Sequence, residues 1–511
     1  MAAGRELLSK ARPILAAMLC LMLTAACGAR SAAYDPEPWL ADYAILKKGL
    51  ERAYANLAWF ASPQGGVDLP DLDRRTLAAL AAAHSDKDAK AALMAFVKAI
   101  PDAHLQLLDP HTAADLAAQD GPDHGLLGHL VSGECGDYDL ADGLKTGFSL
   151  PFDKAGARLA PKSGNPFASG LYDTPDGMRI GLVRIPSFEL RQYPDLCRGA
   201  AAQLRKGSEQ TLGLDLDDFV HAGFLFFLAQ TLAELKQHGA QAMVVDLGDN
   251  PGGGDTGQIS TGLLAAEPLR SNPIWMVAGD PAAHMFDHQL RVLRAARTRA
   301  EADVSARRDL DNAIAAVKAR DVAIPAHACD MAWVWRERRP WAPSGCSNLT
   351  EAGFMAGPEQ VADWRAYANH ASAAALYIPA SLGVMQGAWH GPVYVVTDET
   401  TASAAEMFGA ILQDNHAGKV VGRHTVGAGC GNQGPYRFVT LPRMRAALRV
   451  SDCVLIRADG SDEVAGLTPD LPVDGETPAA RAQATLARIA EDLRKTTPAA
   501  TPTQDTAPTP R

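Results

Sequence analysis

The chain has 511 residues, which is long enough for two or more domains with large buried cores. Its 47% apolar and 21% charged residues are typical of a soluble globular protein and argue against wholesale disorder. The formal net charge of -11 argues against a nucleic acid partner, and no apolar run after the N-terminal stretch is long enough to span a membrane.

Residues 1–27 have the basic, apolar and small-residue regions of a secretory signal, in that order. Small residues directly before Cys27 are similar to the lipobox of bacterial lipoproteins, which implies that Cys27 is lipidated and becomes the mature N-terminus. Because Thr24 stands where Leu is more typical, ordinary signal cleavage with an incidental Cys27 is the alternative. In both cases we expect a protein of the bacterial cell envelope, and with the lipid it would be anchored in the periplasm.

The cysteines agree with export. Of the 8 cysteines, Cys20 lies in the signal and Cys27 at its end, and an even number outside the cytoplasm predicts disulfides. Cys430 and Cys453 lie at the open end of a hairpin predicted over 438–450. By elimination the remaining pairs are Cys329–Cys346 and Cys135–Cys197. No cysteine or histidine spacing suggests zinc, so no metal is expected.

Residues 34–109 are predicted to form a small α-helical N-terminal domain, because apolar side chains recur at helical spacing from residue 38 to residue 100. The domain ends at His104, which is either a catalytic group or an ordinary cap or surface histidine. Residues 110–177 are rich in Gly, Asp and Pro and are interpreted as an irregular connection.

A second domain is expected over residues 178–480. A strand is predicted at 180–188, an apolar helix at 219–238 and a buried strand at 242–247. The glycine-rich loop after the last of these lacks the lysine and the spacing of nucleotide-binding loops. It is therefore either a tight turn or, through the N–H groups of Gly252 or Gly253, half of an oxyanion hole.

Residues 271–385 are interpreted as a long insertion in this domain. It contains a charged helical stretch at 289–322 and a tryptophan-rich part tied by Cys329 and Cys346. That lobe either covers a substrate groove or, as we favour, forms a structural cap with its own small core. A final helix is predicted at 478–495, and the Pro- and Thr-rich residues 496–511 are expected to be disordered.

Ser403 lies where a buried strand predicted at 391–398 meets a helix that begins at Ala404. A side chain there is held rigidly next to the unpaired N–H groups of a helix start, which favour developing negative charge. Ser403 is therefore a candidate nucleophile, with an ordinary N-cap serine as the alternative.

Taken together and in order, these stretches resemble the S41 serine peptidases, the family of the carboxy-terminal processing and tricorn-type proteases. The matching stretches are residues 102–104 (DAH), 180–188, 245–253 (VDLGDNPGG), 401–406 (TASAAE), 422–427 (GRHTVG) and 466–470 (GLTPD). The resemblance implies an α/β crotonase-like core of ββα repeats after a small α-helical N-terminal domain. It also implies an acyl-enzyme on Ser403, with the oxyanion bound by the N–H groups of Ala404 and of Gly252 or Gly253, and neither a metal nor an organic cofactor.

The base separates two branches of this family. Processing proteases use a lysine at the place of Ala428, so that dyad is absent here. The tricorn-type branch uses a histidine and a glutamate, which match His104 and Glu463, although its serine before the histidine is Ala103 here. His424, closer in sequence to the nucleophile, is the alternative base. Residues 110–175 are also short for a PDZ module, so none is expected.

The primary hypothesis is an exported serine peptidase that cleaves peptides or unfolded protein and meets the membrane only through a lipid anchor. The alternatives are a catalytically inactive or binding lipoprotein with the S41 fold, and a serine hydrolase acting on non-peptide acyl substrates. The sequence leaves the natural substrate and the oligomeric state open.

Overall fold

The computed structural model describes residues 34–119, 135, 144–161, 164–206, 216–299, 304–324, 329–354, 373–376, 382–383, 385–433 and 437–496. The signal with Cys27 and the C-terminal tail from 497 lie outside these ranges. Among the described helices, none combines the length and the apolar character that a membrane crossing needs.

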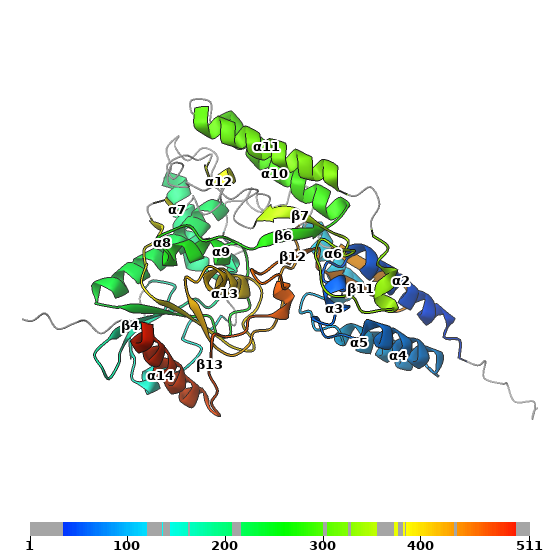
Figure 1. Cartoon of the computed structure of the whole chain (residues 1–511), viewed down its shortest axis with the longest axis horizontal. Helices are drawn as coiled ribbons and strands as arrows, with labels where there is room; N and C mark the ends of the chain where they lie inside the picture. The colour runs from blue at the N-terminus through cyan, green and yellow to red at the C-terminus, as the bar shows by residue number, and fades with distance from the viewer. Residues whose placement is uncertain are drawn as a thin grey trace, which may run out of the picture.

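A seven-stranded sheet forms the centre of the larger lobe, with the order β13-β9-β8-β5-β4-β3-β2 (Figure 1). Its strands are β2 Arg158–Leu159, β3 Ser169–Asp173, β4 Arg179–Arg184, β5 Ala242–Asp246, β8 Val393–Thr397, β9 Lys419–Gly422 and β13 Leu471–Pro472. The pairs from β4 through β13 are parallel, and β2 and β3 add antiparallel strands at one edge. In β5 and β8 every residue is buried, as expected for parallel strands covered on both faces.

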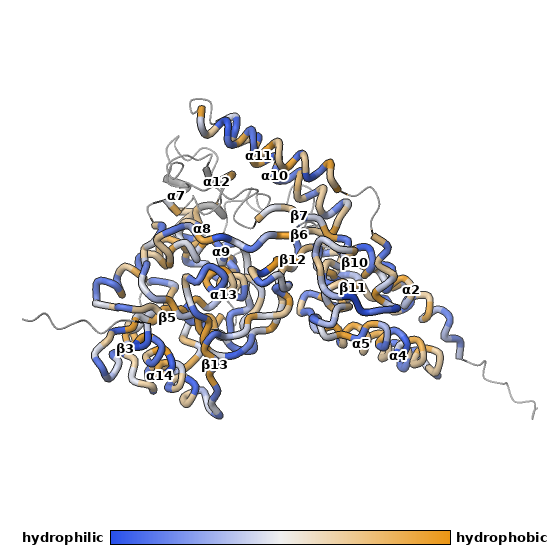
Figure 2. Tube along the Cα trace, in the orientation of Figure 1, coloured by the Kyte–Doolittle hydropathy of each residue, from blue (hydrophilic) through white to orange (hydrophobic). Residues whose placement is uncertain are grey.

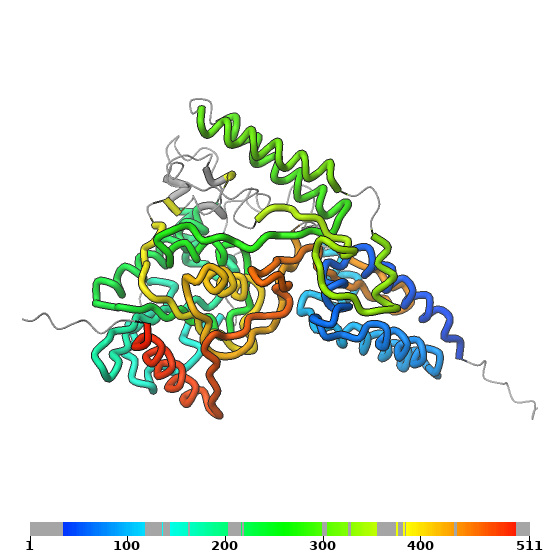
Figure 3. The backbone as a smooth tube through the Cα atoms, in the orientation of Figure 1, coloured from blue at the N-terminus to red at the C-terminus, as the bar shows by residue number. Residues whose placement is uncertain are grey.

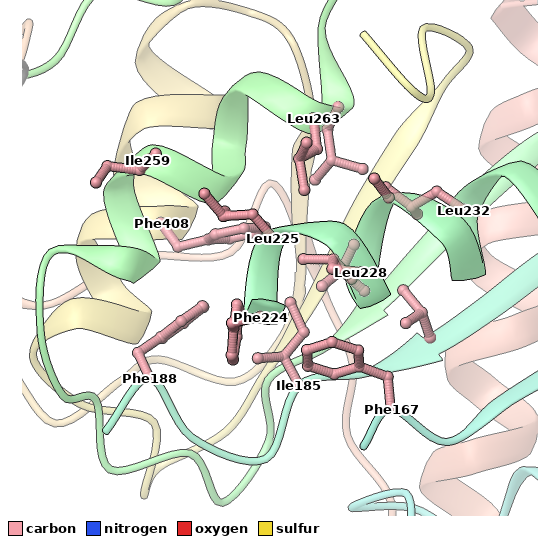
Figure 4. Packing of buried hydrophobic residues seen from close by; sticks show 14 of the residues in the cluster. Phe167, Ile185, Phe188, Phe224, Leu225, Leu228, Leu232, Ile259, Leu263 and Phe408 are labelled. Carbon is pink, nitrogen blue, oxygen red and sulfur yellow. The ribbon is translucent and has the colours of Figure 1, made fainter. Parts of the chain in front are cut away.

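Alternate strand residues face two different cores. On one face Val245 packs with Phe188, Phe224 and Phe408, which gather at close quarters in Figure 4. This face is covered by α7 Pro194–Lys206, α8 Leu216–Gln237, α9 Thr256–Ser260 and α13 Ala404–Asp414. On the other face Val244 packs against α14 Pro478–Thr496 and the short helix η2 Phe152–Ala155. Helix α13, which begins directly after Ser403, is thereby fixed against the sheet by aromatic packing.

The smaller lobe contains the N-terminal helices and a C-terminal hairpin, side by side in Figure 3. Its helices are α2 Glu37–Ala53, α3 Leu57–Phe60, α4 Leu69–Ala81, α5 Asp86–Lys98 and α6 Pro110–Gln119. Its three-stranded sheet has the order β1-β11-β10, with β1 Gln106–Leu108, β10 Arg437–Leu441 and β11 Ala446–Val450. Gln106 pairs with Arg449, so the end of the helical domain is joined to the chain that follows the nucleophile.

The insertion is more closely integrated than the sequence analysis expects. Its strands β6 Pro273–Val277 and β7 Leu349–Phe354 form a sheet with β12 Cys453–Leu455, and the charged stretch is two helices, α10 Asp280–Arg299 and α11 Val304–Ala323. Hydrophobic and hydrophilic residues alternate along this helical hairpin (Figure 2). The prediction that the tryptophan lobe has its own small core is wrong, because Trp333 and Trp335 of η6 Met331–Trp335 are buried in the core of the N-terminal helices.

The interpretation of residues 110–177 as an irregular connection is also wrong in part. Residues 110–119 form α6, and β2 and β3 continue the main sheet beyond β4. Within the described part of this stretch there is no PDZ module, because its strands belong to the large sheet.

All three predicted disulfides are present: Cys135–Cys197, Cys329–Cys346 and Cys430–Cys453. The last joins the loop after β9 to the start of β12, with its Cα atoms 5.5 Å apart and both cysteines buried. This disulfide therefore holds in place the loop in which Gly431 packs against the ring of His104.

Candidate active site

Ser403 occupies a strained turn between β8 and α13. Its φ of 53° and ψ of -121° put a non-glycine residue in a region that side chains rarely adopt. Such conformations persist only where the surrounding structure enforces them, and they concentrate at functional sites. The turn is held from outside, since the N–H of Ala402 donates to the carbonyl of Asn250 at 3.0 Å.

A buried carboxylate holds this turn from inside. Glu406, fully buried, accepts the N–H of Ser403 at 2.7 Å and the N–H of Ala428 at 2.9 Å on one oxygen. Its other oxygen accepts the hydroxyl of Thr425 at 2.5 Å and the N–H of Gly427 at 2.7 Å. Four donors on one carboxylate therefore fix Ser403 relative to the loop at 425–428.

That same loop holds His104. The ring nitrogen Nδ1 lies 2.9 Å from the carbonyl oxygen of Ala428. Because a carbonyl oxygen only accepts, Nδ1 is the protonated nitrogen, and in the neutral ring the lone pair is on Nε2. Nε2 lies against Gly431, where a Cβ would come within 3.0 Å of it. Ser403 and His104 are thus attached to two sides of one loop through Glu406 and the Ala428 carbonyl.

The glycine loop approaches the nucleophile closely. A Cβ on Gly252, whose φ is +95°, would lie 2.8 Å from Cβ of Ser403 and 2.9 Å from the nitrogen of Ala404. The N–H of Gly252 donates to the side chain of Asn250 at 2.8 Å. Among the described residues, no acceptor takes the N–H of Gly253 or of Ala404. Two free donors thus lie on the two loops that meet at Ser403.

Glu463 is placed differently from the expectation that it supports a histidine. It lies in the short helix η9 Glu463–Ala465, is 1% exposed, and neither carboxylate oxygen has a partner in the described structure. Burial raises its pKa well above the ordinary value, opposed by Arg457 and reinforced by Glu406. Although its backbone packs behind Gly429, no hydrogen bond or ion pair joins Glu463 to His104 among the described side chains.

His424, the alternative base, also contacts the loop at 425–428. Its Nδ1 lies 2.8 Å from the carbonyl of its neighbour Thr425, and its ring lies against Gly466. Within the described residues, no hydrogen bond joins Ser403 to His424 or to His104. Catalytic hydrogen bonds are often formed only with substrate bound, so the missing contacts exclude neither histidine as the base.

Two groups that hold Ser403 and His104 in place were not identified from the sequence: the carboxylate of Glu406 and the carbonyl of Ala428. Glu406 stands three residues after a serine at a helix start, which is the spacing of a capping box and was available as a signal. The carbonyl of Ala428 had no such signal, since a backbone oxygen is common to every residue.

In the part of the chain that the structure describes, no cluster of His, Cys, Asp and Glu suits a metal ion.

Comparisons with known proteins identify the family and the fold of this chain. The sequence model of peptidase family S41 matches residues 179–473, which is more than half of the chain. No curated protein sequence matches. The structure of mature CPAF complexed with lactacystin is similar, with a TM-score of 0.52 and 13% identity over 90% of this chain and 98% of that chain. Mature CPAF alone gives a TM-score of 0.51 at 13% identity over 90% and 97%. At such identities the likeness shows a shared fold.

Proposed function

The chain belongs to peptidase family S41, and on this premise we propose that it is an exported serine peptidase that hydrolyses peptide bonds through an acyl-enzyme on Ser403. The observation that carries the proposal is the strained Ser403 turn, tied by Glu406 to the loop whose carbonyl orients His104. A rigid serine and an oriented imidazole held by the same loop are the components that nucleophilic acyl transfer needs.

His104 is the proposed general base. As the Ser403 oxygen bonds to the substrate carbonyl carbon, its proton passes to the Nε2 lone pair and an imidazolium forms. The tetrahedral intermediate collapses when the carbon–nitrogen bond breaks and the imidazolium gives its proton to the leaving amine. In the second half of the reaction, water attacks the acyl-enzyme carbonyl and gives its proton to His104. The bond to the Ser403 oxygen then breaks, and His104 returns the proton to that oxygen. The Nδ1 contact with Ala428 supports this role because it selects the neutral tautomer whose lone pair is on Nε2.

The N–H groups of Gly253 and Ala404 are the proposed oxyanion donors. Their lack of an acceptor in the described structure supports this choice, whereas the N–H of Gly252 is already engaged by Asn250. Gly252 instead allows the close approach, since any side chain there would meet Ser403. Donors fixed before reaction stabilise developing negative charge without reorganisation.

The proposed location is the bacterial cell envelope, with a lipid anchor at Cys27. The signal-like residues 1–27 support export, and three disulfides suit an oxidising compartment. Globomycin treatment of expressing cells tests the anchor. Accumulation of the uncleaved precursor is expected, and processing that continues unchanged would favour the ordinary signal cleavage.

Hydrolysis itself is tested with the oxidised protein, an unfolded protein substrate and a panel of peptides and short-chain esters. We expect cleavage of unfolded protein and peptides by the wild type and none by the Ser403→Ala variant. Hydrolysis of esters alone would favour the non-peptidase hydrolase. Turnover of neither class by a folded protein would favour the binding lipoprotein.

A further inference from the structure

His104 has a carboxylate neighbour other than Glu463. An oxygen of Asp102 lies 3.8 Å from Nδ1 of His104, too far for a hydrogen bond but close enough for strong attraction to a protonated ring. The Asp102 side chain is completely buried and the His104 side chain is 18% exposed. Because the carboxylate is buried, this attraction is screened less than one between exposed charges.

The surroundings of Asp102 suit a fixed negative charge. The carboxylate accepts the hydroxyl of Tyr54 at 2.7 Å, the side-chain amide of Asn56 at 2.9 Å and the N–H of His104 at 2.8 Å. The hydroxyl of Ser451 lies at 3.5 Å. Each of these groups is a donor to the carboxylate, and an ionised carboxylate can only accept hydrogen bonds.

Glu463 lacks these features. Its oxygens have no donors in the described structure, and burial raises its pKa well above the ordinary value. No hydrogen bond or ion pair joins Glu463 to His104 among the described side chains. Arg457, the cation that opposes this shift, is itself engaged by Asp414 at 2.6 Å.

We propose that Asp102, rather than Glu463, is the carboxylate that stabilises protonated His104 during acylation. Asp102 acts through the ring as a positioning residue, while the Ala428 carbonyl fixes the tautomer. In this step the Ser403 proton moves to Nε2, Asp102 stays ionised, and no proton passes to it. The inference rests on the proposed function and adds to it the identity of the third group.

The test is the pH dependence of labelling by a fluorophosphonate probe, measured on the full oxidised protein from pH 5 to pH 9. The probe phosphonylates an activated serine without needing the natural substrate. In Asp102→Asn we expect the maximal rate constant to fall about 10- to 100-fold and the half-maximal pH to fall by about one unit. Two further titratable or charged groups lie near this pair. Arg449 donates to the carbonyl of His104, and Asp462 has a pKa that burial raises, with a further contribution from the charge of Asp102.

Asp73→Asn is the matched control, because Asp73 is also a buried acid that accepts a tyrosine hydroxyl, from Tyr43 at 2.8 Å. It should lower stability without moving the half-maximal pH. Glu463→Gln should lower the maximal rate less than Asp102→Asn and leave the half-maximal pH in place.

A shift to lower pH in Glu463→Gln, or a profile of Asp102→Asn that matches the Asp73→Asn control, would overturn the inference. Should Asp102→Asn not fold, the half-maximal pH of Glu463→Gln decides alone: an unmoved value supports Asp102 and a lower value refutes it. A wild-type protein that the probe does not label would instead refute the proposed function, and with it this inference.

Discussion

Substitution of Glu406 by Gln examines the connection between nucleophile and base. One carboxylate oxygen serves Ser403 and Ala428, and the other serves Thr425 and Gly427. The glutamine amide has one accepting oxygen and an NH₂ group that accepts nothing, so one pair of buried donors must lose its acceptor.

The size of the effect follows from these contacts. A hydrogen bond to a charged acceptor contributes about 1.5–3 kcal/mol, so the loss of two predicts a decrease of about 3–6 kcal/mol in the free energy of unfolding. Urea denaturation of the oxidised protein measures this decrease. At a temperature where the variant stays folded, fluorophosphonate labelling of Ser403 should also slow, because the turn and the His104 loop are no longer held together.

The matched control is Glu491→Gln on α14. Glu491 contacts Lys495 and Arg488, and all three side chains are substantially exposed. Its replacement should change the free energy of unfolding by less than about 0.5 kcal/mol. If Glu406→Gln were as stable as this control and were labelled at the wild-type rate, the four-donor network would have no role in positioning Ser403.

Three further predictions concern the same region. Gly252→Ala should slow labelling about 100-fold, because its Cβ would lie 2.7 Å from the backbone oxygen of Ala402 in the Ser403 turn. The control is Gly254→Ala, whose Cβ would have no atom within 4 Å and which should be labelled at the wild-type rate. Replacing Cys430 and Cys453 by alanine should lower the free energy of unfolding by about 2–4 kcal/mol in urea, and an unchanged urea midpoint would contradict this. Burial raises the pKa of Asp462 to about 8, so the folded state binds an extra proton and stability should fall as pH rises from about 4 to 8. Asp462→Asn removes this penalty, so its gain in the urea midpoint over wild type should be larger at pH 8 than at pH 5, and equal gains would refute the assignment.

The sequence predicts the central sheet well where strands are buried on both faces. The runs that form β5 and β8 are continuously apolar, which distinguishes them from their surroundings. The short β3 was missed because Ser169–Asp173 has no such pattern, and its place in the sheet depends on pairing with β4. The tryptophan lobe was misjudged for a similar reason, since its partners are helices about 280 residues earlier, as in the contact of Trp335 with Glu51.

Some residues of the candidate site were predictable from local sequence, and others depend on distant parts of the chain. Local patterns and the family resemblance indicate Ser403, His104 and the glycine loop, because each lies in a short motif. The identity of the group at Nδ1 of His104 could not be predicted, because it is the backbone of a residue 324 positions away. The state of Glu463 depends on its burial by distant segments, so its match to a family position says little about its charge.

The most direct test of the account is peptide mapping by mass spectrometry after the oxidised protein reacts with a fluorophosphonate. The account predicts one adduct, on Ser403, with labelling slowed about 10²- to 10⁴-fold in His104→Ala and far less in His424→Ala. An unmodified Ser403 in folded protein, or labelling that depends on His424 and not on His104, would contradict it.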